Sequence, residues 1–575
     1  MTDATLALPV SAPALKRQAD AARIHSRAGH EAAILLAVSA LFIALTGVLL
    51  WPWLVHLHSA LAGPPEDNMN DLWNTWYTSV ASVPGHFFHT RLLRFPEGTP
   101  LTYQSFNYPQ IFVVTALSRF LGTDLPTLVA LQNLTLLASF PLAGLGGFYL
   151  VRHLTDSAVA GLAGGFVFAF SPFHVAQASH HIGVGAIEFL PFFALAYLLA
   201  LDKRSASWLC AAVICFALSA LSCWYYLFYG AYFLSFQVLY QRFRTGAWPR
   251  GWPLLAPALC VALTIAILLP FLVPMIIAGG QSLYAEGGNT FSADLLAYVA
   301  FPPQHFLSFI SRGLYARFTG NPWETTVYLG LINLALLLWH WSRTGFARES
   351  LNAYCALGIV VFALLAGGEA LHVAGAVTII HLPDAVLDKL PFFADVRTPA
   401  RAAVFVYLFM SVGVGAAVAA LWRQSNPAAK WFVAAVSVLL ILDFFPCRLQ
   451  TTPIGLSPGL HLLRADKDPD FGVLNLPFGY AEEDSYMLEQ ISHRRPMVDG
   501  MTAREQSVSL LNRLSFHDLG KQRNQLVQAH VKYILIHHRS TGYYKWNAIL
   551  APLPEFLRTY TPVYTDTRLT ILRVY

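Results

Sequence analysis

The chain has 575 residues, of which 37 are Lys or Arg and 32 are Asp or Glu, so charged residues make up 12% and apolar residues 56%. A soluble domain carries about 25% charged residues, and the strands of an outer-membrane barrel alternate without long apolar runs. The composition excludes both classes and also a disordered chain. The net charge of +5 without a basic cluster argues against nucleic acid as a partner.

A polar N-terminal tail, residues 1–30, lacks the short apolar core and cleavage site of a secretory signal. Eleven apolar runs follow it, and runs of about 20 such residues are long enough to cross a bilayer. We therefore predict a polytopic α-helical membrane protein. The expected spans lie near 32–56, 126–151, 157–172, 184–201, 207–222, 223–241, 253–279, 324–342, 351–367, 400–422 and 430–446.

Basic residues in short loops predict the orientation, because they are enriched on the cytoplasmic side. Five basic loops after the basic tail alternate with poorly basic ones, provided that the shorter run 108–121 does not cross the membrane. We interpret that run as an interfacial helix. The tail is then cytoplasmic, and the C-terminal part is periplasmic, at the inner membrane of a bacterium.

The membrane part, residues 31–447, is expected to be followed by a small α/β domain, residues 448–575. Of the 69 charged residues, 27 lie in this last part. Strands are predicted at 471–478, 531–538 and 569–575, and helical structure, with a break near Gly520, at 504–530. No nucleophile elbow, phosphate loop or metal motif occurs there.

The first outer loop, residues 56–125, holds the candidates for acid–base chemistry. Glu66, Asp67 and Asp71 follow the first span, and Trp73 and Trp76 come next as a membrane-interface aromatic pair. A carboxylate at the bilayer surface can act as the general base for a hydroxyl acceptor. Alternatively, the acids are the N-terminal turn of an interfacial helix, where the helix dipole favours negative charge.

Arg397 and Arg401 are basic residues on the expected outer side, against the positive-inside rule. Four residues apart, they share one face if the segment is helical, and guanidinium groups suit phosphate recognition. The alternatives are pairing with Asp395 or snorkelling to lipid headgroups.

Further candidates lie at the ends of spans. His180 and His181 suit a phosphate or sugar hydroxyls, or a structural role. Glu188 is an acid inside an apolar run, which is costly and marks a candidate substrate pocket, or it bonds a neighbouring helix. Asp294 and Glu324 bracket the second outer loop and are expected to contact donor or acceptor, although Glu324 suits a helix cap as well.

Six motifs together resemble the GT-C superfamily of integral-membrane glycosyltransferases, in particular bacterial enzymes that use polyprenyl-phosphate sugars. The likeness covers about residues 30–450. The motifs are Asp67 with Trp73, FPEGTPL (95–101), FAFSPFHVAQASHH (168–181), SCWYYLFYG (222–230), WETTVYLG (323–330) and LPFFADVRTPARAAVF (390–405).

The resemblance implies transfer of a sugar from a polyprenyl-phosphate donor to a hydroxyl of a glycan, lipid or protein acceptor, with inversion. Asp67 aligns with the family's catalytic acid and is assigned as the base, with Asp71 second and Glu66 third. The donor phosphate is assigned to Arg397, Arg401, His180 and His181. No obligatory metal or other cofactor is expected. A lipid or polysaccharide transporter (flippase) and a non-enzymatic envelope scaffold are the alternatives, although a transporter would show internal repeats, and we find none.

Overall fold

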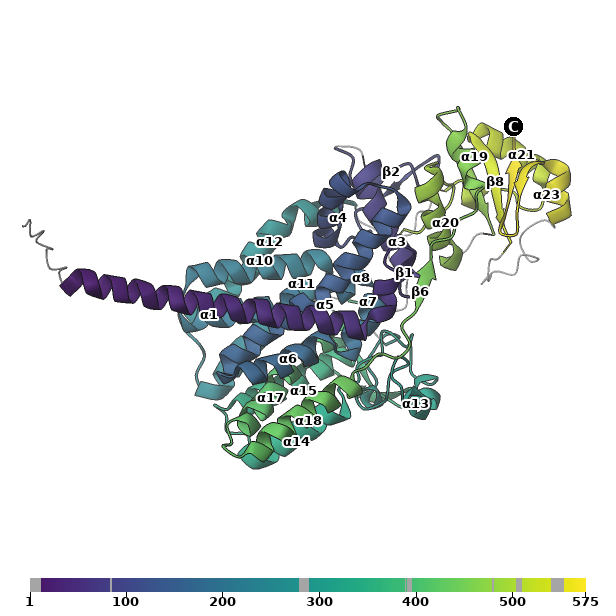
Figure 1. Ribbon diagram of the computed structural model, residues 1–575. Coiled ribbons are helices and arrows are strands. Elements are labelled where there is room, and N and C mark those ends of the chain that lie inside the picture. Colours follow the sequence, from purple (N-terminus) through teal and green to yellow (C-terminus); the bar gives the residue numbers. More distant parts are fainter. Residues whose placement is uncertain are drawn as a thin grey trace, which may run out of the picture.

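The computed structural model describes residues 12–82, 85–278, 289–387, 389, 396–477, 480–502, 509–538 and 553–575. Helices occur at all eleven expected spans (Figure 1). They are α1 (Ala12–Leu49), α5 (Leu125–Thr155), α6 (Ala158–Ala169), α9 (Phe189–Asp202), α10 (Ala206–Ser222), α11 (Tyr225–Thr245), α12 (Trp252–Ala278), α14 (Leu331–Thr344), α15 (Leu351–Ala366), α17 (Ala403–Trp422) and α18 (Pro427–Asp443).

Within the described residues, six helical segments are long and apolar enough to cross a membrane. They are Gly29–Leu49, Leu125–Thr155, Ala158–His180, Ile182–Asp202, Trp252–Ala278 and Pro399–Trp422. The run 108–121 forms α4 (Tyr108–Leu121). Its 14 residues rise about 21 Å, less than the hydrocarbon thickness of about 30 Å.

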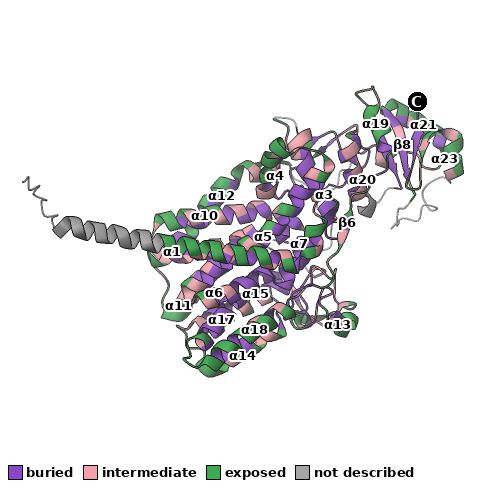
Figure 2. Ribbon diagram, in the orientation of Figure 1, coloured by how far each residue is buried: buried purple, intermediate pink, exposed green. Residues whose placement is uncertain are grey.

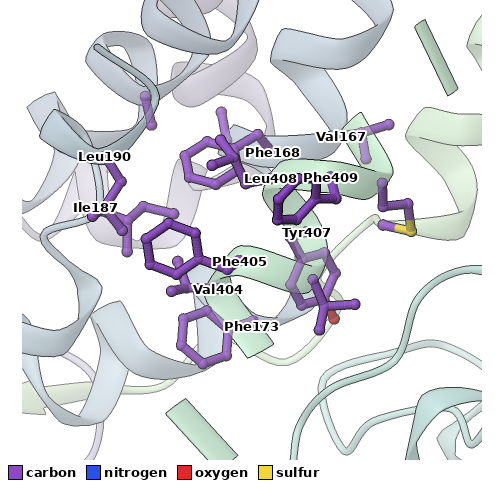
Figure 3. Close-up of a cluster of buried hydrophobic side chains, with 14 of the residues drawn as sticks. Val167, Phe168, Phe173, Ile187, Leu190, Val404, Phe405, Tyr407, Leu408 and Phe409 are labelled. Carbon is purple, nitrogen blue, oxygen red and sulfur yellow. The ribbon is translucent and has the colours of Figure 1, made fainter. Parts of the chain in front are cut away.

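The core of the helical part is built around the segment Pro399–Trp422, which contains α17 and is 89% buried over its most apolar stretch. Figure 3 shows its side chains interleaved with those of α6, α7 (Pro172–His180) and the start of α9. Phe405 stacks on Phe233 of α11 with ring centroids 5.5 Å apart, and the Phe409 ring lies tilted to Phe233 at 6.1 Å. This close packing positions α7, which ends at His180, and the start of α17, which follows Arg401.

Peripheral helices expose large apolar side chains (Figure 2). Leu36 of α1 is 70% exposed, Ile277 of α12 79% and Trp431 of α18 77%. Such a surface is unfavourable in water and favourable in lipid. The burial pattern therefore agrees with the composition in indicating a membrane protein.

The third expected span is longer than its apolar run. Helix α6 ends at Ala169, and α7 continues the segment to His180 after a break at Ser171 and Pro172. Ser171 caps α7 by accepting a hydrogen bond from the backbone of His174, and Pro suits the first helical position. The expected end at residue 172 was wrong, because a proline that favours a helix start resembles a terminator in sequence.

The loop between α1 and α5 is largely structured. It contains helix α3, which carries the candidate acids, and α4. Its elements are α2 (Trp51–Val55), β1 (Ala60–Ala62), α3 (Asp67–Trp76), a π-helical turn (Tyr77–Ala81), β2 (His89–Thr90) and β3 (Thr99–Pro100). Trp73 and Trp76 are 0% and 1% exposed. The prediction of an interfacial aromatic pair was therefore wrong, because the C-terminal part of the chain covers α3.

Three further connecting regions contain short elements. The region after α7 adds α8 (Ile182–Gly185), and the region between α12 and α14 contains α13 (Ser308–Tyr315). The antiparallel hairpin of β4 (Ala370–Val373) and β5 (Ala376–His381) and helix α16 (Asp384–Leu387) follow α15.

The C-terminal part contains a four-stranded sheet in the order β7-β8-β10-β9. Strand β7 (Gly472–Leu476) is parallel to β8 (Val531–His537), and β10 (Leu569–Arg573) is antiparallel to β8 and to β9 (Thr561–Thr565). Three of these strands lie where the sequence predicted strands. The helices are α19 (Leu460–Ala465), α20 (Tyr480–His493), α21 (Leu519–Gln528) and α23 (Leu553–Thr559).

The predicted helical segment 504–530 is helical in part. Residues 503–508 lie outside the described part, and only 519–528 form an α-helix of this segment. Gly520 lies inside α21 and does not break it. Helix α21 begins at Leu519 because Asp518 caps it, with its side chain accepting a hydrogen bond from the backbone N–H of Lys521.

The C-terminal part is attached to the first loop. Strand β6 (Thr451–Pro453) pairs antiparallel with β1, with Leu61 opposite Thr452. The backbone N–H of Phe95 donates to Met497, and that of Met497 donates to Leu92, at 2.8 Å each. Segments almost 400 residues apart thus form one unit around α3 (Figure 1).

Candidate functional site

Asp67 begins helix α3, after the Pro64–Pro65 pair. Buried amides fix the preceding turn. Asn68 donates to the Ala62 carbonyl at 3.0 Å, and Asn133 of α5 accepts from the Ala62 N–H at 3.0 Å. Asp67 is therefore held at a defined place, at the helix end where the dipole favours a carboxylate.

Gly63 allows this turn to lie against the end of α7. Its φ is +97°, and a Cβ there would lie 1.8 Å from the Ser179 carbonyl oxygen. Only glycine fits such a contact and such a backbone conformation. The close approach brings Asp67 next to His181, two residues beyond Ser179.

His181 bridges two carboxylates. Its Nδ1 lies 2.7 Å from Oδ2 of Asp67, and its Nε2 lies 3.1 Å from Oε1 of Glu324. A ring with an acceptor at each nitrogen is satisfied when both nitrogens carry protons. Burial opposes this charge, but Asp67 and Glu324 raise the pKa of His181 to about 9.

Glu324 continues the network to Arg401. The Arg401 Nε lies 3.1 Å from each Glu324 oxygen, and Nη2 also bonds Oε1. Gln177 of α7 donates to Glu324 Oε2 at 3.0 Å. The Arg401 guanidinium also lies 4.8 Å from the ring centroid of Tyr225, a cation–π geometry. Arg401 is thus engaged by protein groups on two sides.

The network leaves Asp67 and Glu324 ionised. Burial alone would raise both pKa values, but His181 lowers the pKa of Asp67, and Arg401 with His181 lowers that of Glu324. The Asp67 side chain is 37% exposed, whereas that of Glu324 is 3% exposed. Asp67 is therefore the accessible end of a chain of alternating charges: Asp67, His181, Glu324 and Arg401.

Asp71 lies one helical turn beyond Asp67 and is in a different protonation state. Burial and the neighbouring Asp67 charge raise the pKa of Asp71 to about 8. The same two effects raise the pKa of Glu66. Of the three candidate acids, Asp67 alone has a lowered pKa, which makes it the better choice for a base at neutral pH.

His180 does not join the bridge. It is 8% exposed, its ring stacks on Trp323 at 4.3 Å, and its Nδ1 lies 3.0 Å from the Ala176 carbonyl oxygen. Trp323 precedes Glu324, so the stack supports the position of that carboxylate. Glu324 itself does not cap a helix, because α14 begins only at Leu331.

Arg397 and Arg401 do not share a helix face. Residues 396–398 are not helical, and a 3-10 turn spans Pro399–Ala402 before α17. The helical premise was wrong, because Pro399 disfavours helical geometry in the residue before it. Asp395, the alternative partner, lies outside the described residues.

Glu188 and Asp294 lie apart from the network. Glu188 precedes α9 and lines a cavity of about 170 Å³ between α4, α5 and the α7–α9 region, together with Asn107, Gln110 and Ser139. Asp294 accepts hydrogen bonds from the backbone N–H groups of Leu296, Ala374 and Gly375 at 2.7 to 3.1 Å. It fixes the β4–β5 hairpin.

Two acids of the Asp-x-Asp run at 466–470, Asp466 and Asp468, are bonded to neighbouring side chains. Lys532 lies 2.9 Å from Asp466 and 3.3 Å from Asp468, and the Tyr533 hydroxyl donates to Asp466 at 2.6 Å. Across the described ranges, no group of three or more His, Cys, Asp or Glu is arranged to hold a metal ion.

Sequence reasoning missed Gly63, Asn68, Gln177 and Trp323. Gly63 precedes a Pro-Pro pair, which is typical of a turn, but nothing local indicates its contact with α7. The buried amides carry no periodic signal, because Asn and Gln are usually exposed. Gln177 and Trp323 lie inside two of the motifs, FAFSPFHVAQASHH and WETTVYLG.

A family model described as a domain of unknown function (DUF6311) matches residues 72–445. No curated protein sequence matches the chain. Among solved structures, the arabinofuranosyltransferase AftD from mycobacteria is similar with a TM-score of 0.50 and 14% identity, over 88% of this chain and 36% of the AftD chain.

Two further structures are similar. An oligosaccharyltransferase from Archaeoglobus fulgidus has a TM-score of 0.47 and 12% identity, over 88% of this chain and 69% of its own. ArnT from Cupriavidus metallidurans, bound to undecaprenyl phosphate, has a TM-score of 0.41 and 12% identity, over 93% and 98%. The likeness to AftD shows the fold, which is the one that the resemblance in the motifs implies.

Proposed function

Since the chain belongs to the family described as a domain of unknown function (DUF6311), we propose its function from its own residues: it transfers a sugar from a polyprenyl-phosphate donor to an acceptor hydroxyl, with Asp67 as the general base. One observation carries the proposal. A partly exposed, ionised carboxylate stands at the end of a buried charge network in a GT-C fold. The reaction takes place at the outer face of a bacterial inner membrane.

The chemistry follows from the position of Asp67. The acceptor oxygen attacks the anomeric carbon, and its proton moves to the Asp67 carboxylate. The bond between that carbon and the phosphate oxygen breaks, and the phosphate leaves with the electron pair. Attack from the opposite side inverts the configuration. A base has to be ionised and within hydrogen-bond reach of the acceptor hydroxyl. His181 keeps Asp67 ionised and orients its carboxylate by holding one oxygen at 2.7 Å.

The leaving phosphate needs positive charge. We assign the phosphate contact to the two basic residues at the entry to α17, Arg397 and Arg401. Arg401 is also the last member of the charge network. In Arg397→Gln we expect the KM for the donor to rise about tenfold or more, the value of a lost charge-assisted hydrogen bond. An unchanged donor KM would remove Arg397 from the site.

The scaffold alternative predicts that the outer acids and arginines face lipid or water without converging on a cavity. The bonded chain from Asp67 through His181 and Glu324 to Arg401 argues against it. The transporter alternative has no specific observation in its favour.

Reconstituted protein tests the proposal. Proteoliposomes receive a panel of undecaprenyl-phosphate sugars and a water-soluble alkyl glycoside, and transfer is followed by mass spectrometry. Asp67→Asn is expected to lower kcat by about 10² or more, as for loss of a general base. Asp124→Asn is the matched control. Asp124 caps α5 on the same loop, and Asn caps helices equally well. Wild-type rates in Asp67→Asn would overturn the base assignment.

A further inference from the structure

Helix α20 of the C-terminal part lies against α3, the helix of Asp67 and Asp71 (Figure 1). The indole N–H of Trp73 donates to Gln490 Oε1 at 2.6 Å. Gln490 is 0% exposed and donates in turn to the Leu92 and Arg495 carbonyls at 2.7 and 2.9 Å. These bonds fix α20 on α3.

Two acids of α20 are buried at this contact, and their surroundings differ. Glu483 forms an ion pair with Arg94 at 3.4 Å. Asp484 is 4% exposed, and its Oδ1 is buried without a hydrogen-bond partner among the described residues. A buried polar atom left unpaired is costly in a folded protein. The cost is offset when a ligand supplies the partner.

Three of the four carboxyl groups that act electrostatically on Asp484 belong to the candidate site, and the fourth is its neighbour Glu483. Burial comes first, and Asp67, Glu483, Asp71 and Glu66 together raise the pKa of Asp484 well above its ordinary value. The raised pKa values of Asp484 and Asp71 both favour the uncharged form of the carboxyl group. A neutral carboxyl group both donates and accepts hydrogen bonds, which suits the hydroxyl groups of an uncharged polyol better than a cation.

We infer that Asp484, with Asp71, binds hydroxyl groups of the acceptor next to the one that Asp67 deprotonates, so that the C-terminal part of the chain forms one wall of the acceptor site. The geometry that carries this is the unpaired, buried Oδ1 on a helix fixed against α3. The inference rests on the proposed function for the identity of its ligand as an acceptor.

Two substitutions distinguish hydroxyl binding from cation binding. Asp484→Asn keeps the shape, one donor and one acceptor of a neutral carboxyl group, whereas Asp484→Ala removes them. We expect Asp484→Ala to raise the KM for an n-octyl glycoside acceptor about tenfold, with the donor KM unchanged, and Asp484→Asn to stay within about twofold of wild type. Asp470→Asn, an exposed acid of the same part of the chain, is the control.

A binding measurement keeps this inference separate from the proposed function. Affinity for the octyl glycoside alone, by isothermal titration in detergent, is expected to fall about tenfold in Asp484→Ala and not in Asp484→Asn or Asp470→Asn. If affinity falls only in Asp484→Ala and the wild type transfers no sugar, the proposed function is wrong, but Asp484 still binds a polyol. Equal losses in Asp484→Asn and Asp484→Ala would mean a cation ligand, and unchanged affinity in both would mean no ligand contact. Either result would overturn the inference.

Discussion

Nδ1 of His181 lies 2.7 Å from Oδ2 of Asp67. The imidazole keeps Asp67 ionised and directs its carboxylate. In His181→Gln we expect kcat of sugar transfer to fall by about 10², because the base loses its orientation and its countercharge. The control is His153→Gln, since His153 also faces an Asp, with 3.4 Å between its Nε2 and Asp202, in a pair outside the site. Similar kcat values for the two variants would refute the role of His181.

The Glu324–Arg401 pair is expected to be essential for stability. Removing one partner of a buried ion pair costs about 3–5 kcal/mol, because the other charge stays buried. Arg401→Met should therefore unfold at a markedly lower temperature, as measured by intrinsic tryptophan fluorescence in detergent. Arg152→Met is the comparison. Arg152 pairs with Glu31 at 2.7 Å on a more exposed surface, where such pairs contribute about 0–1 kcal/mol. Equal shifts in melting temperature would contradict the expectation.

Stability should fall as the pH rises. The pKa of His181 is raised from 6.5 to about 9, so its stabilisation is complete below pH 6.5 and is lost as the pH rises through about 9. The pKa of Asp71 is raised from 3.8 to about 8, so its share is lost between these values. We expect the melting temperature of the wild type to decrease from pH 6.5 to 9. Between pH 5 and 8, the melting temperature of Asp71→Asn should decrease less than that of the wild type. A flat profile in wild type would show that the bridge carries no charged imidazole.

Gly63 should tolerate no side chain. Since a Cβ would lie 1.8 Å from the Ser179 carbonyl oxygen, Gly63→Ala has to move the turn away from α7, and Asp67 with it. We expect at least a tenfold loss of kcat, because small misplacements of catalytic groups are costly. Gly85→Ala is the control. Gly85 has a similar φ of +82° in the same loop, with nothing within 4 Å of its Cβ. Loss of activity in both variants alike would indicate backbone strain instead of the contact.

The helices were predictable from sequence because lipid requires long apolar runs, and helices occur at each expected position. Asp67 and Glu324 were predictable as candidates because charge is rare in this chain. Their connection was not, because 114 residues separate Asp67 from His181 and no local pattern encodes such a contact. Asp484 escaped notice for the opposite reason, since it lies in a segment where acids are common.

The pairing of β1 with β6 has a consequence for biosynthesis. Gly63 and Thr452 are joined by a hydrogen bond across 389 residues, so the first loop leaves the ribosome long before its partner strand exists. At about 5–20 residues per second, the wait is roughly 20–80 s. In newly made chains the first loop therefore lacks its partner strand during most of synthesis. The β1–β6 pair forms only after residues 451–453 have emerged from the ribosome.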